Sequence, residues 1–216
     1  MSSTHILIIR HGETESNVGK ILQGHLDISL NERGQHRAKL LAEALAQGDP
    51  VHAVYASDLV RARDTAAAIA QAQASQLSVN EILGLRERHF GECQGCSFAE
   101  IGVEWPDHPR HLRERTPEWV PPGGGESLVM LRDRVLSTVD DPARQHIGQR
   151  IVIVAHGGVL DILYRAAMGM ELATPRTWDM TNTAVNRLLW TPEGLSIEHW
   201  GDTSHLDAQG RDEIAA

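Results

Sequence analysis

Two histidines in this chain follow short apolar runs and precede a glycine. The first run ends at Arg10-His11-Gly12, and the second, over residues 150–155, is followed by His156-Gly157. An imidazole can act as a nucleophile or stabilise charge near neutral pH, because its ordinary pKa is about 6.5. Two histidines in the same local setting therefore suggest one shared reactive site.

Arginines occur in the first histidine motif and in a third segment between the two histidines. Arg10 directly precedes the first histidine, and Arg61 lies at the start of a predicted helix, just after Ser57-Asp58-Leu59. A cation is poorly placed at a helix N-terminus, where the helix dipole is positive, so this position favours a ligand-binding role for Arg61. Guanidinium groups bind phosphate in a bidentate manner. These residue types indicate chemistry on an anionic group.

The elements that must position these residues alternate between strands and helices. Apolar β-branched runs predict buried strands over residues 5–9, 51–56 and 150–155. Helical spacing predicts helices over residues 34–46, 59–72, 126–139 and 158–168, the third of which should end before Pro142. Two further strands are expected over residues 185–200, joined at Pro192-Glu193-Gly194.

This order of elements predicts an α/β fold with a mostly parallel central sheet and helices on both faces. Ligands bind beyond the carboxyl ends of the strands in such sheets, which is where both histidines fall. We expect one domain over residues 1–216. Residues 93–125 have no clean periodicity, and a loop-rich insertion of this length usually contacts the substrate.

The composition narrows the class of protein. A net charge of −9 argues against a nucleic-acid-binding surface, which is usually basic. No apolar run approaches the roughly 20 residues that cross a bilayer, so we expect a cytoplasmic protein that does not bind a membrane. Cys93 and Cys96 form a lone C-x-x-C without the context of a redox or zinc motif, and we expect reduced thiols with no functional role.

The sequence resembles the histidine phosphatase superfamily, the phosphoglycerate mutase-like enzymes. The resemblance rests on motifs that occur in family order from Ile6 to about Asn186: Arg10-His-Gly-Glu-Thr-Glu-Ser-Asn17, Gln23-Gly24, Ser57-Asp-Leu59 with Arg61, Leu85-Arg-Glu-Arg-His-Phe-Gly91, Gly125-Glu-Ser127 and His156-Gly157. Each motif is weak alone, and the ordered set is specific. The resemblance implies a three-layer α/β/α fold of the phosphoglycerate mutase type.

The resemblance also implies a role for each site residue. His11 would attack phosphorus and form a covalent phosphohistidine, which requires a neutral ring whose other nitrogen is hydrogen-bonded. Positive charge from Arg10 and Arg61, together with His156, would stabilise the transferring phosphoryl group. The expected substrate-binding set is completed by Asn17, Gln23, Gly24 and Gly157.

The leaving oxygen needs a general acid. One branch of the superfamily carries an aspartate directly after the second histidine, but here that position is Gly157. Glu87 matches the proton donor of the other branch, and it could then activate the hydrolytic water. Glu13 competes for this role, although Thr14 and the residues after it make Glu13 look like part of a helix start. Other candidate carboxylates are Glu81, Glu92 and Glu126, the last of which lies in an expected helix start.

The function expected from this set is metal-independent hydrolysis of a small phosphorylated metabolite, without a cofactor. The alternative is a phosphoglycerate mutase primed by 2,3-bisphosphoglycerate. Mutases of the family carry a Leu-Gln-Gly-Leu-Asn-Lys-like stretch and a later Arg-Arg pair, whereas this chain has Glu92-Cys-Gln-Gly-Cys-Ser-Phe98 and separated arginines at 110, 113 and 115. These departures favour a phosphatase. A noncatalytic phospholigand-binding protein is a weaker alternative, and a metallohydrolase is disfavoured by the lack of a His-Glu-x-x-His motif.

The substrate itself stays open at this stage. Candidates for lining its pocket are Trp105, His108, His111 and Trp119, together with Arg110, Arg113 and Arg115. The expected partner is a small phosphorylated metabolite, with neither nucleic acid nor membrane. The sequence does not decide between a monomer and a homodimer.

Overall fold

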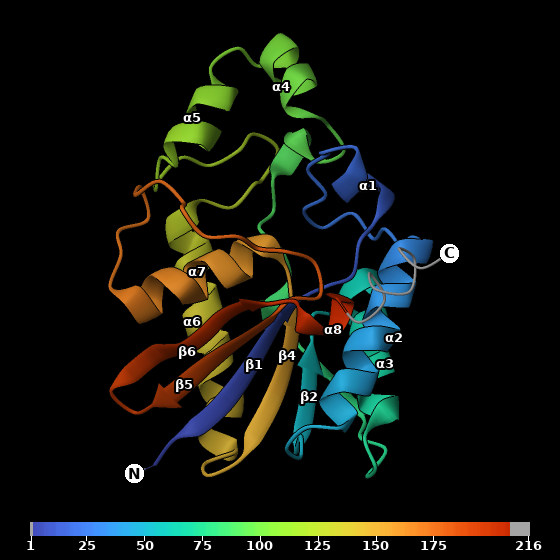
Figure 1. The fold of residues 1–216 in the computed structure, drawn as a ribbon. Coiled ribbons are helices and arrows are strands. Elements are labelled where there is room, and N and C mark those ends of the chain that lie inside the picture. Colours follow the sequence, from blue (N-terminus) through green and yellow to red (C-terminus); the bar gives the residue numbers. More distant parts are fainter. Residues whose placement is uncertain (1, 208–216) are drawn as a thin grey trace.

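The computed structural model describes residues 2–207 and consists of a six-stranded sheet between two layers of helices (Figure 1). The strand order is β3-β2-β4-β1-β5-β6. The strands are β1 (Thr4–Arg10), β2 (Ala53–Ala56), β3 (Val79–Glu81), β4 (Arg150–Ala155), β5 (Val185–Thr191) and β6 (Gly194–Asp202). The pairs β3–β2, β2–β4 and β4–β1 are parallel, whereas β5 and β6 extend the sheet in antiparallel fashion.

The central strands are buried on both faces, and alternate residues contribute to two separate cores. Ile6 and Ile8 of β1 face α6 (Leu128–Gln145) and α7 (Gly157–Met168), whereas Leu7 and Ile9 face the opposite layer. That second layer consists of α2 (Glu32–Ala46) and α3 (Val60–Ala72). Burial of both faces explains why these strands are continuous β-branched runs rather than alternating ones.

The register of the two central strands sets the position of both histidines. β1 and β4 pair in parallel, with Arg10 opposite Ala155. His11 and His156 follow directly, so they leave the sheet side by side at its carboxyl edge. The prediction that the fold brings these residues together is confirmed.

Two expectations about helices differ from the structure. Helix α6 continues through Pro142 to Gln145, although we expected it to end before the proline. Proline removes one helical hydrogen bond, but Val139, Pro142 and Ala143 are all buried. The Ala143 carbonyl also accepts a hydrogen bond from Thr4 Oγ1 at 2.7 Å. Tertiary packing therefore holds the last turn in place.

Residues 93–125 are less irregular than expected. They include α4 (Phe98–Glu104) and α5 (His108–Glu114), which lie above the carboxyl ends of the strands in Figure 1. A capping box between Ser97 and Glu100 begins α4, a signal already present in the sequence. We refer to residues 93–125 as the cap.

Smaller elements complete the described chain. They are α1 (Glu15–Val18), α8 (Ser204–Asp207) and two 3₁₀ turns, η1 (Leu83–Leu85) and η2 (Gly91–Cys93). The short edge strand β3 was not expected from the sequence. Within residues 2–207, none of the helices combines the length and the apolar character that a membrane span requires.

Candidate active site

The His11 ring is held in one tautomer at the end of β1. Its backbone N–H extends the sheet ladder to the Ala155 carbonyl at 3.0 Å. The ring is almost fully buried, and its Nδ1 lies 2.7 Å from the Gly12 carbonyl oxygen. Because a carbonyl can only accept, Nδ1 carries the proton, and the lone pair is on Nε2. His11 therefore has the form that a nucleophilic imidazole requires.

His156 lies against His11, with ring centroids 5.1 Å apart. Burial, followed by the charges of Arg10 and Arg61, holds the pKa of His11 well below its usual value. Burial likewise holds the pKa of His156 well below its usual value, with His11 and Arg61 as the next causes. Both rings are therefore neutral at pH 7.

Two buried guanidinium groups complete the positive lining. Arg61 is fully buried and donates to the carbonyls of Leu26 and Gly24, each at 2.7 Å. Burial lowers the pKa of Arg61 to about 10, so it stays charged at neutral pH. Arg10 donates through Nη1 to the Met180 carbonyl at 2.6 Å. Within the described chain, these contacts are to carbonyls, and neither arginine forms an ion pair with a carboxylate.

Several buried polar atoms of this cluster have no protein partner among residues 2–207. They are Nε of Arg10, Nε of Arg61, both ring nitrogens of His156 and Oε1 of Gln23. Burying a charged or polar group without a partner is costly, so such a concentration marks a place built for a ligand. The donors lack hydrogen-bond partners, and the two arginines form no ion pair with a carboxylate in the described chain. Both features indicate that the ligand is an anion.

A cavity of about 120 Å³ lies among these residues, and its lining includes Arg10, His11, Asn17, Gln23, Gly24, Arg61 and Glu87. This volume corresponds to about four water molecules at ~30 Å³ each, which suits a phosphoryl group. We refer to it as the phosphoryl pocket. It brings together all the site residues expected from the sequence except His156 and Gly157. His156 lies against the His11 ring, which lines the pocket, and Gly157 lies beside Arg10 and Glu87.

Asn17 is oriented toward the phosphoryl pocket by a helix cap. Thr14 caps α1, and the Asn17 Oδ1 atom accepts from the backbone N–H of Thr14 at 3.1 Å. Because Oδ1 is occupied, the amide NH₂ is the group that Asn17 can offer to a ligand. Glu13, the competing carboxylate, instead accepts from Asn31 at the start of α2 at 3.1 Å and does not line the pocket.

The Glu87 carboxylate is held at the N-terminus of α7. The backbone N–H of Gly158 donates to both carboxylate oxygens, at 2.9 and 3.1 Å, and the N–H of Arg88 donates at 2.8 Å. A Cβ atom on Gly158 would lie 2.2 Å from Glu87 Oε1. The absence of a side chain at residue 158 therefore allows the carboxylate to reach both the helix N-terminus and the phosphoryl pocket.

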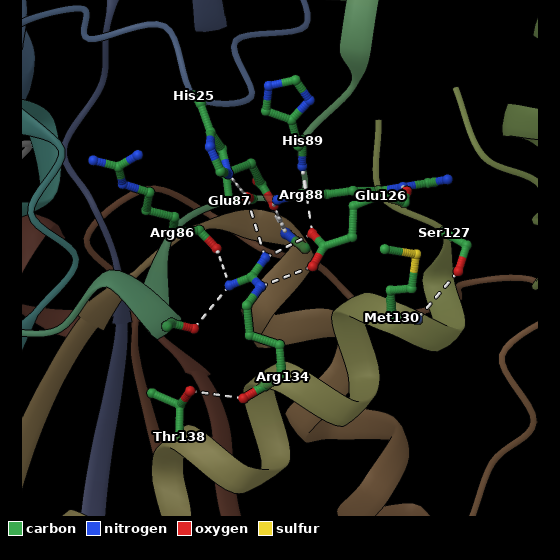
Figure 2. A network of polar contacts seen from close by, with 12 residues as sticks. His25, Arg86, Glu87, Arg88, His89, Glu126, Ser127, Met130, Arg134 and Thr138 are labelled. Carbon is green, nitrogen blue, oxygen red and sulfur yellow. Dashed lines mark hydrogen bonds and ion pairs between the residues drawn. The ribbon is translucent and has the colours of Figure 1, made fainter. Parts of the chain in front are cut away.

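A network centred on Arg134 of α6 fixes the backbone beneath Glu87 (Figure 2). Arg134 Nη1 donates to the carbonyls of Gly84 and Arg86, at 2.8 and 2.9 Å. The same guanidinium binds the Glu126 carboxylate at 2.8 and 2.7 Å. Glu126 is thus engaged in this network and does not line the phosphoryl pocket, while Ser127 caps α6 as expected.

Two residues that hold the His11 motif were not singled out from the sequence. Asn182 Nδ2 donates to the His11 carbonyl at 2.7 Å from the loop before β5. Thr65 Oγ1 of α3 accepts from the Gly12 N–H at 3.0 Å. The polar run Thr181-Asn182-Thr183 marks a loop before an apolar strand, but it does not indicate a contact with His11.

A second cavity, of about 560 Å³, shares Arg10, Leu22, Glu87 and Phe90 with the phosphoryl pocket and extends beneath the cap. We refer to it as the outer cavity. Arg113 and Arg115 line it as expected, but Arg110 does not. The aromatic candidates do not line it: His111 stacks on Trp119 at 5.2 Å, and His108 lies between Trp105 and Trp119. These half-buried rings pack against one another within the cap.

The side chains that could bind a metal ion do not form a cluster in the described part of the chain. Within residues 2–207, no three His, Cys, Asp or Glu side chains are arranged to hold a metal ion. Cys93 and Cys96 are free thiols, and burial raises the pKa of Cys93.

Comparison with known proteins identifies this arrangement. The family model of the histidine phosphatase superfamily (branch 1) matches residues 6–203. The chain belongs to the histidine phosphatase superfamily. The resemblance predicted from the ordered motifs is thereby confirmed, as is the three-layer fold.

Relatives of this chain carry names of two kinds. It is 38% identical over 206 residues to phosphoglycerate mutase-like protein 4 of Arabidopsis thaliana, covering 95% of this chain and 88% of the relative. It is 35% identical over 207 residues to a metal-independent phosphoserine phosphatase of the same plant, covering 96% and 85%. A solved mycobacterial glucosyl-3-phosphoglycerate phosphatase superposes with a TM-score of 0.82 at 31% identity, covering 93% of this chain and 100% of that one. The chain is thus an enzyme of the phosphatase or mutase-like type.

Proposed function

We propose that this enzyme hydrolyses phosphomonoesters, without a metal ion, through a covalent phosphohistidine at His11. The observation that carries the proposal is the His11 ring itself. Its Nδ1–H is bound to the Gly12 carbonyl, its pKa is lowered, and the ring borders a small pocket with unpaired cationic donors. A neutral nucleophile beside an anion-binding pocket suits attack on phosphorus.

In the first step, His11 Nε2 attacks phosphorus and the bond to the ester oxygen breaks. Arg10, Arg61 and His156 donate hydrogen bonds to the equatorial oxygens, where negative charge concentrates in the transition state. Glu87, in its protonated form, donates a proton to the leaving oxygen. The Nδ1–H bond to Gly12 persists and stabilises the positive charge that develops on the phosphorylated ring.

In the second step, the Glu87 carboxylate removes a proton from a water molecule as its oxygen attacks phosphorus. The N–P bond breaks, which releases inorganic phosphate and restores neutral His11 and protonated Glu87. Asn17 supports both steps by donating from its amide NH₂, and Gln23 and Gly24 form the far wall of the pocket.

Phosphoglycerate mutase activity, primed by 2,3-bisphosphoglycerate, is the second candidate function. Its support is the 38% identity to a phosphoglycerate mutase-like protein. Hydrolysis has the stronger support, because relatives named as phosphatases cover most of the chain and the separated cap arginines differ from the mutase pattern. A protein that only binds phosphorylated ligands would require neither the neutral His11 nor the oriented Glu87.

We further propose that the substrate is a small phosphorylated metabolite and that the enzyme acts in the cytoplasm. Relatives are named for phosphoserine and for glucosyl-3-phosphoglycerate, which are metabolites of this size class. The reaction proposed requires no cofactor and no nucleic-acid or membrane partner.

The test is a panel of phosphomonoesters that includes 3-phosphoglycerate with and without 2,3-bisphosphoglycerate, assayed in the presence of a chelator. Phosphate release should persist under chelation, and a burst of acid-labile phosphoenzyme should form. His11→Ala should abolish both, whereas His52→Ala, at an exposed position, should change neither. If isomerisation were faster than phosphate release, the enzyme would be assigned as a mutase instead of a phosphatase. Full activity of His11→Ala would contradict the mechanism.

A further inference from the structure

The outer cavity is unusually rich in arginine. Five arginines line it, and only two acidic side chains do so: the list is Arg10, Arg88, Arg113, Arg115 and Arg176, with Glu87 and Asp161. Arg10 also belongs to the phosphoryl pocket, where it faces the transferred group. The other four lie where the remainder of a substrate would extend. An arginine among them that has no strong protein partner could bind a group of the substrate.

Three of these four arginines already have partners that fix them. Arg115 forms an ion pair with Asp161 and donates to the Leu172 carbonyl at 2.8 Å. Arg88 donates through Nε to the Glu126 carbonyl at 2.7 Å and through Nη2 to the Trp119 carbonyl at 3.3 Å. Arg113 turns back toward the Pro109 carbonyl of its own helix, at 3.2 Å from Nε.

Arg176 differs from the other three. Its guanidinium makes a weak contact, with Nη1 at 4.0 Å from Met180 Sδ, and within the described chain it forms no ion pair with a carboxylate. Its side chain is exposed. Burial lowers the pKa of Arg10 and of Arg115, and the charge of Arg176 adds to both shifts as a smaller cause. Arg176 is therefore an uncompensated cation at the rim of the outer cavity, within electrostatic reach of the site.

The loop that carries Arg176 is anchored on both sides. It connects α7 to β5 and rises toward α5 in Figure 1. Leu172 is buried before Arg176, and Trp178 is buried after it, stacked on Tyr164 with ring centroids 3.9 Å apart. The Met180 carbonyl then accepts from Arg10. The backbone on either side of Arg176 is thus fixed relative to the phosphoryl pocket, whereas the guanidinium is free to bind.

We propose that Arg176 is a specificity-determining residue that binds a second anionic group of the substrate, a carboxylate or a phosphate, in the outer cavity. This proposal rests on the proposed function and names its substrate class as phosphomonoesters with a second negative charge. A planar guanidinium binds either group in a bidentate manner. An uncharged group at the same place would leave the cation of Arg176 without a partner.

The test compares two substrates that differ in one group. 3-Phosphoglycerate carries a carboxylate where glycerol 3-phosphate carries a hydroxymethyl group. We expect the native enzyme to favour 3-phosphoglycerate in kcat/KM, and Arg176→Ala to lower the ratio of the two values by about 10- to 100-fold, the worth of one charge-assisted hydrogen bond or bidentate pair. Arg176→Lys should retain part of the ratio. Arg176→Glu should shift the preference toward phosphoethanolamine, which carries an amine.

Arg110→Ala is the matched control, because it removes the same charge from the cap outside the outer cavity. It should leave the ratio unchanged. An equal ratio in the native enzyme and Arg176→Ala would overturn the proposal, as would a native preference for glycerol 3-phosphate. Failure of the proposed function would give a different result: the native protein would release no phosphate from any ester, including p-nitrophenyl phosphate.

Discussion

The side-chain amide of Asn182 donates to the main-chain carbonyl of His11 at 2.7 Å, across 171 positions of sequence. The same nitrogen lies 3.4 Å from the Gly12 carbonyl, the group that accepts the His11 Nδ1 proton. The loop before β5 therefore holds the backbone that determines which His11 nitrogen faces the phosphoryl pocket. Asn182 orients the nucleophile without lining the pocket.

Replacing Asn182 with leucine should lower kcat about 10- to 100-fold, because a small misplacement of the nucleophile is costly in rate. KM should change little, since the pocket lining stays intact. The buried carbonyl that loses its donor should also cost ~1–3 kcal/mol of stability. Asn80→Leu is the control, because Asn80 donates to the Val54 carbonyl at 3.1 Å far from His11. If Asn182→Leu retained the native kcat, the orienting role would be wrong.

Glu87→Gln should slow formation of the phosphohistidine most for poor leaving groups. The amide cannot donate a proton to the leaving oxygen, a loss of about 10²–10⁴-fold for alkyl phosphates. p-Nitrophenolate leaves without protonation, so its burst phase should fall far less. Single-turnover kinetics with both ester types would measure the difference. Glu13→Gln, outside the pocket, should leave both rates near native, and equal losses for the two esters in Glu87→Gln would assign the acid role elsewhere.

Arg134→Met should reduce both stability and kcat. The substitution leaves Glu126 without its partner and frees the carbonyls of Gly84 and Arg86, with an expected cost of roughly 2 kcal/mol. Adding Glu126→Gln should restore part of the stability, because the unpaired charge is gone, but not kcat, because the carbonyls that position Glu87 remain free. Urea unfolding and kcat for the single and double variants give the two readouts. Arg132→Met is the control, because the Arg132 side chain is 43% exposed and pairs with Asp133 instead.

The stability of the protein should fall as the pH drops below about 6.5. Burial first, together with nearby positive charge, lowers the pKa values of His11 and His156 in the folded state, while the unfolded chain keeps ordinary values near 6.5. Between the folded and unfolded pKa values, the unfolded chain binds more protons, so the free energy of unfolding decreases with decreasing pH. Each ring contributes up to about 1.4 kcal/mol per pH unit in that window.

The measurement is urea unfolding between pH 5 and 7. His156→Gln should reduce the slope of the unfolding free energy by the contribution of one ring, whereas His52→Gln, at an exposed position, should not alter it. An unchanged slope in His156→Gln would mean that this ring is not kept neutral by the fold.

The local patterns of the sequence were sufficient to place the residues that follow strands. β-Branched runs before His11 and His156 predicted central strands, and parallel pairing of β1 with β4 then brings the two rings together. Arg61 was recognised because a cation at a helix N-terminus is unfavourable unless a ligand is present. The structure places Arg61 beside His11, as it places His156, and this placement could be predicted because each pattern involves residues adjacent in sequence.

Long-range contacts could not be predicted in the same way. No local pattern indicates that Asn182 would reach His11, or that Gly158 would donate to Glu87. Pro142 misled the prediction of α6, because the burial that retains the helix comes from contacts with distant strands. The aromatic residues of the cap were candidates both for the substrate pocket and for packing within the cap, because residue type alone does not distinguish the two.

The unpaired donors of the phosphoryl pocket have a consequence for turnover. Arg10, Arg61 and His156 would donate to inorganic phosphate as they would to a phosphomonoester. The phosphate product keeps the negative charge that these donors bind. Inorganic phosphate should therefore compete with the substrate for this pocket, and it should inhibit the enzyme as this product accumulates.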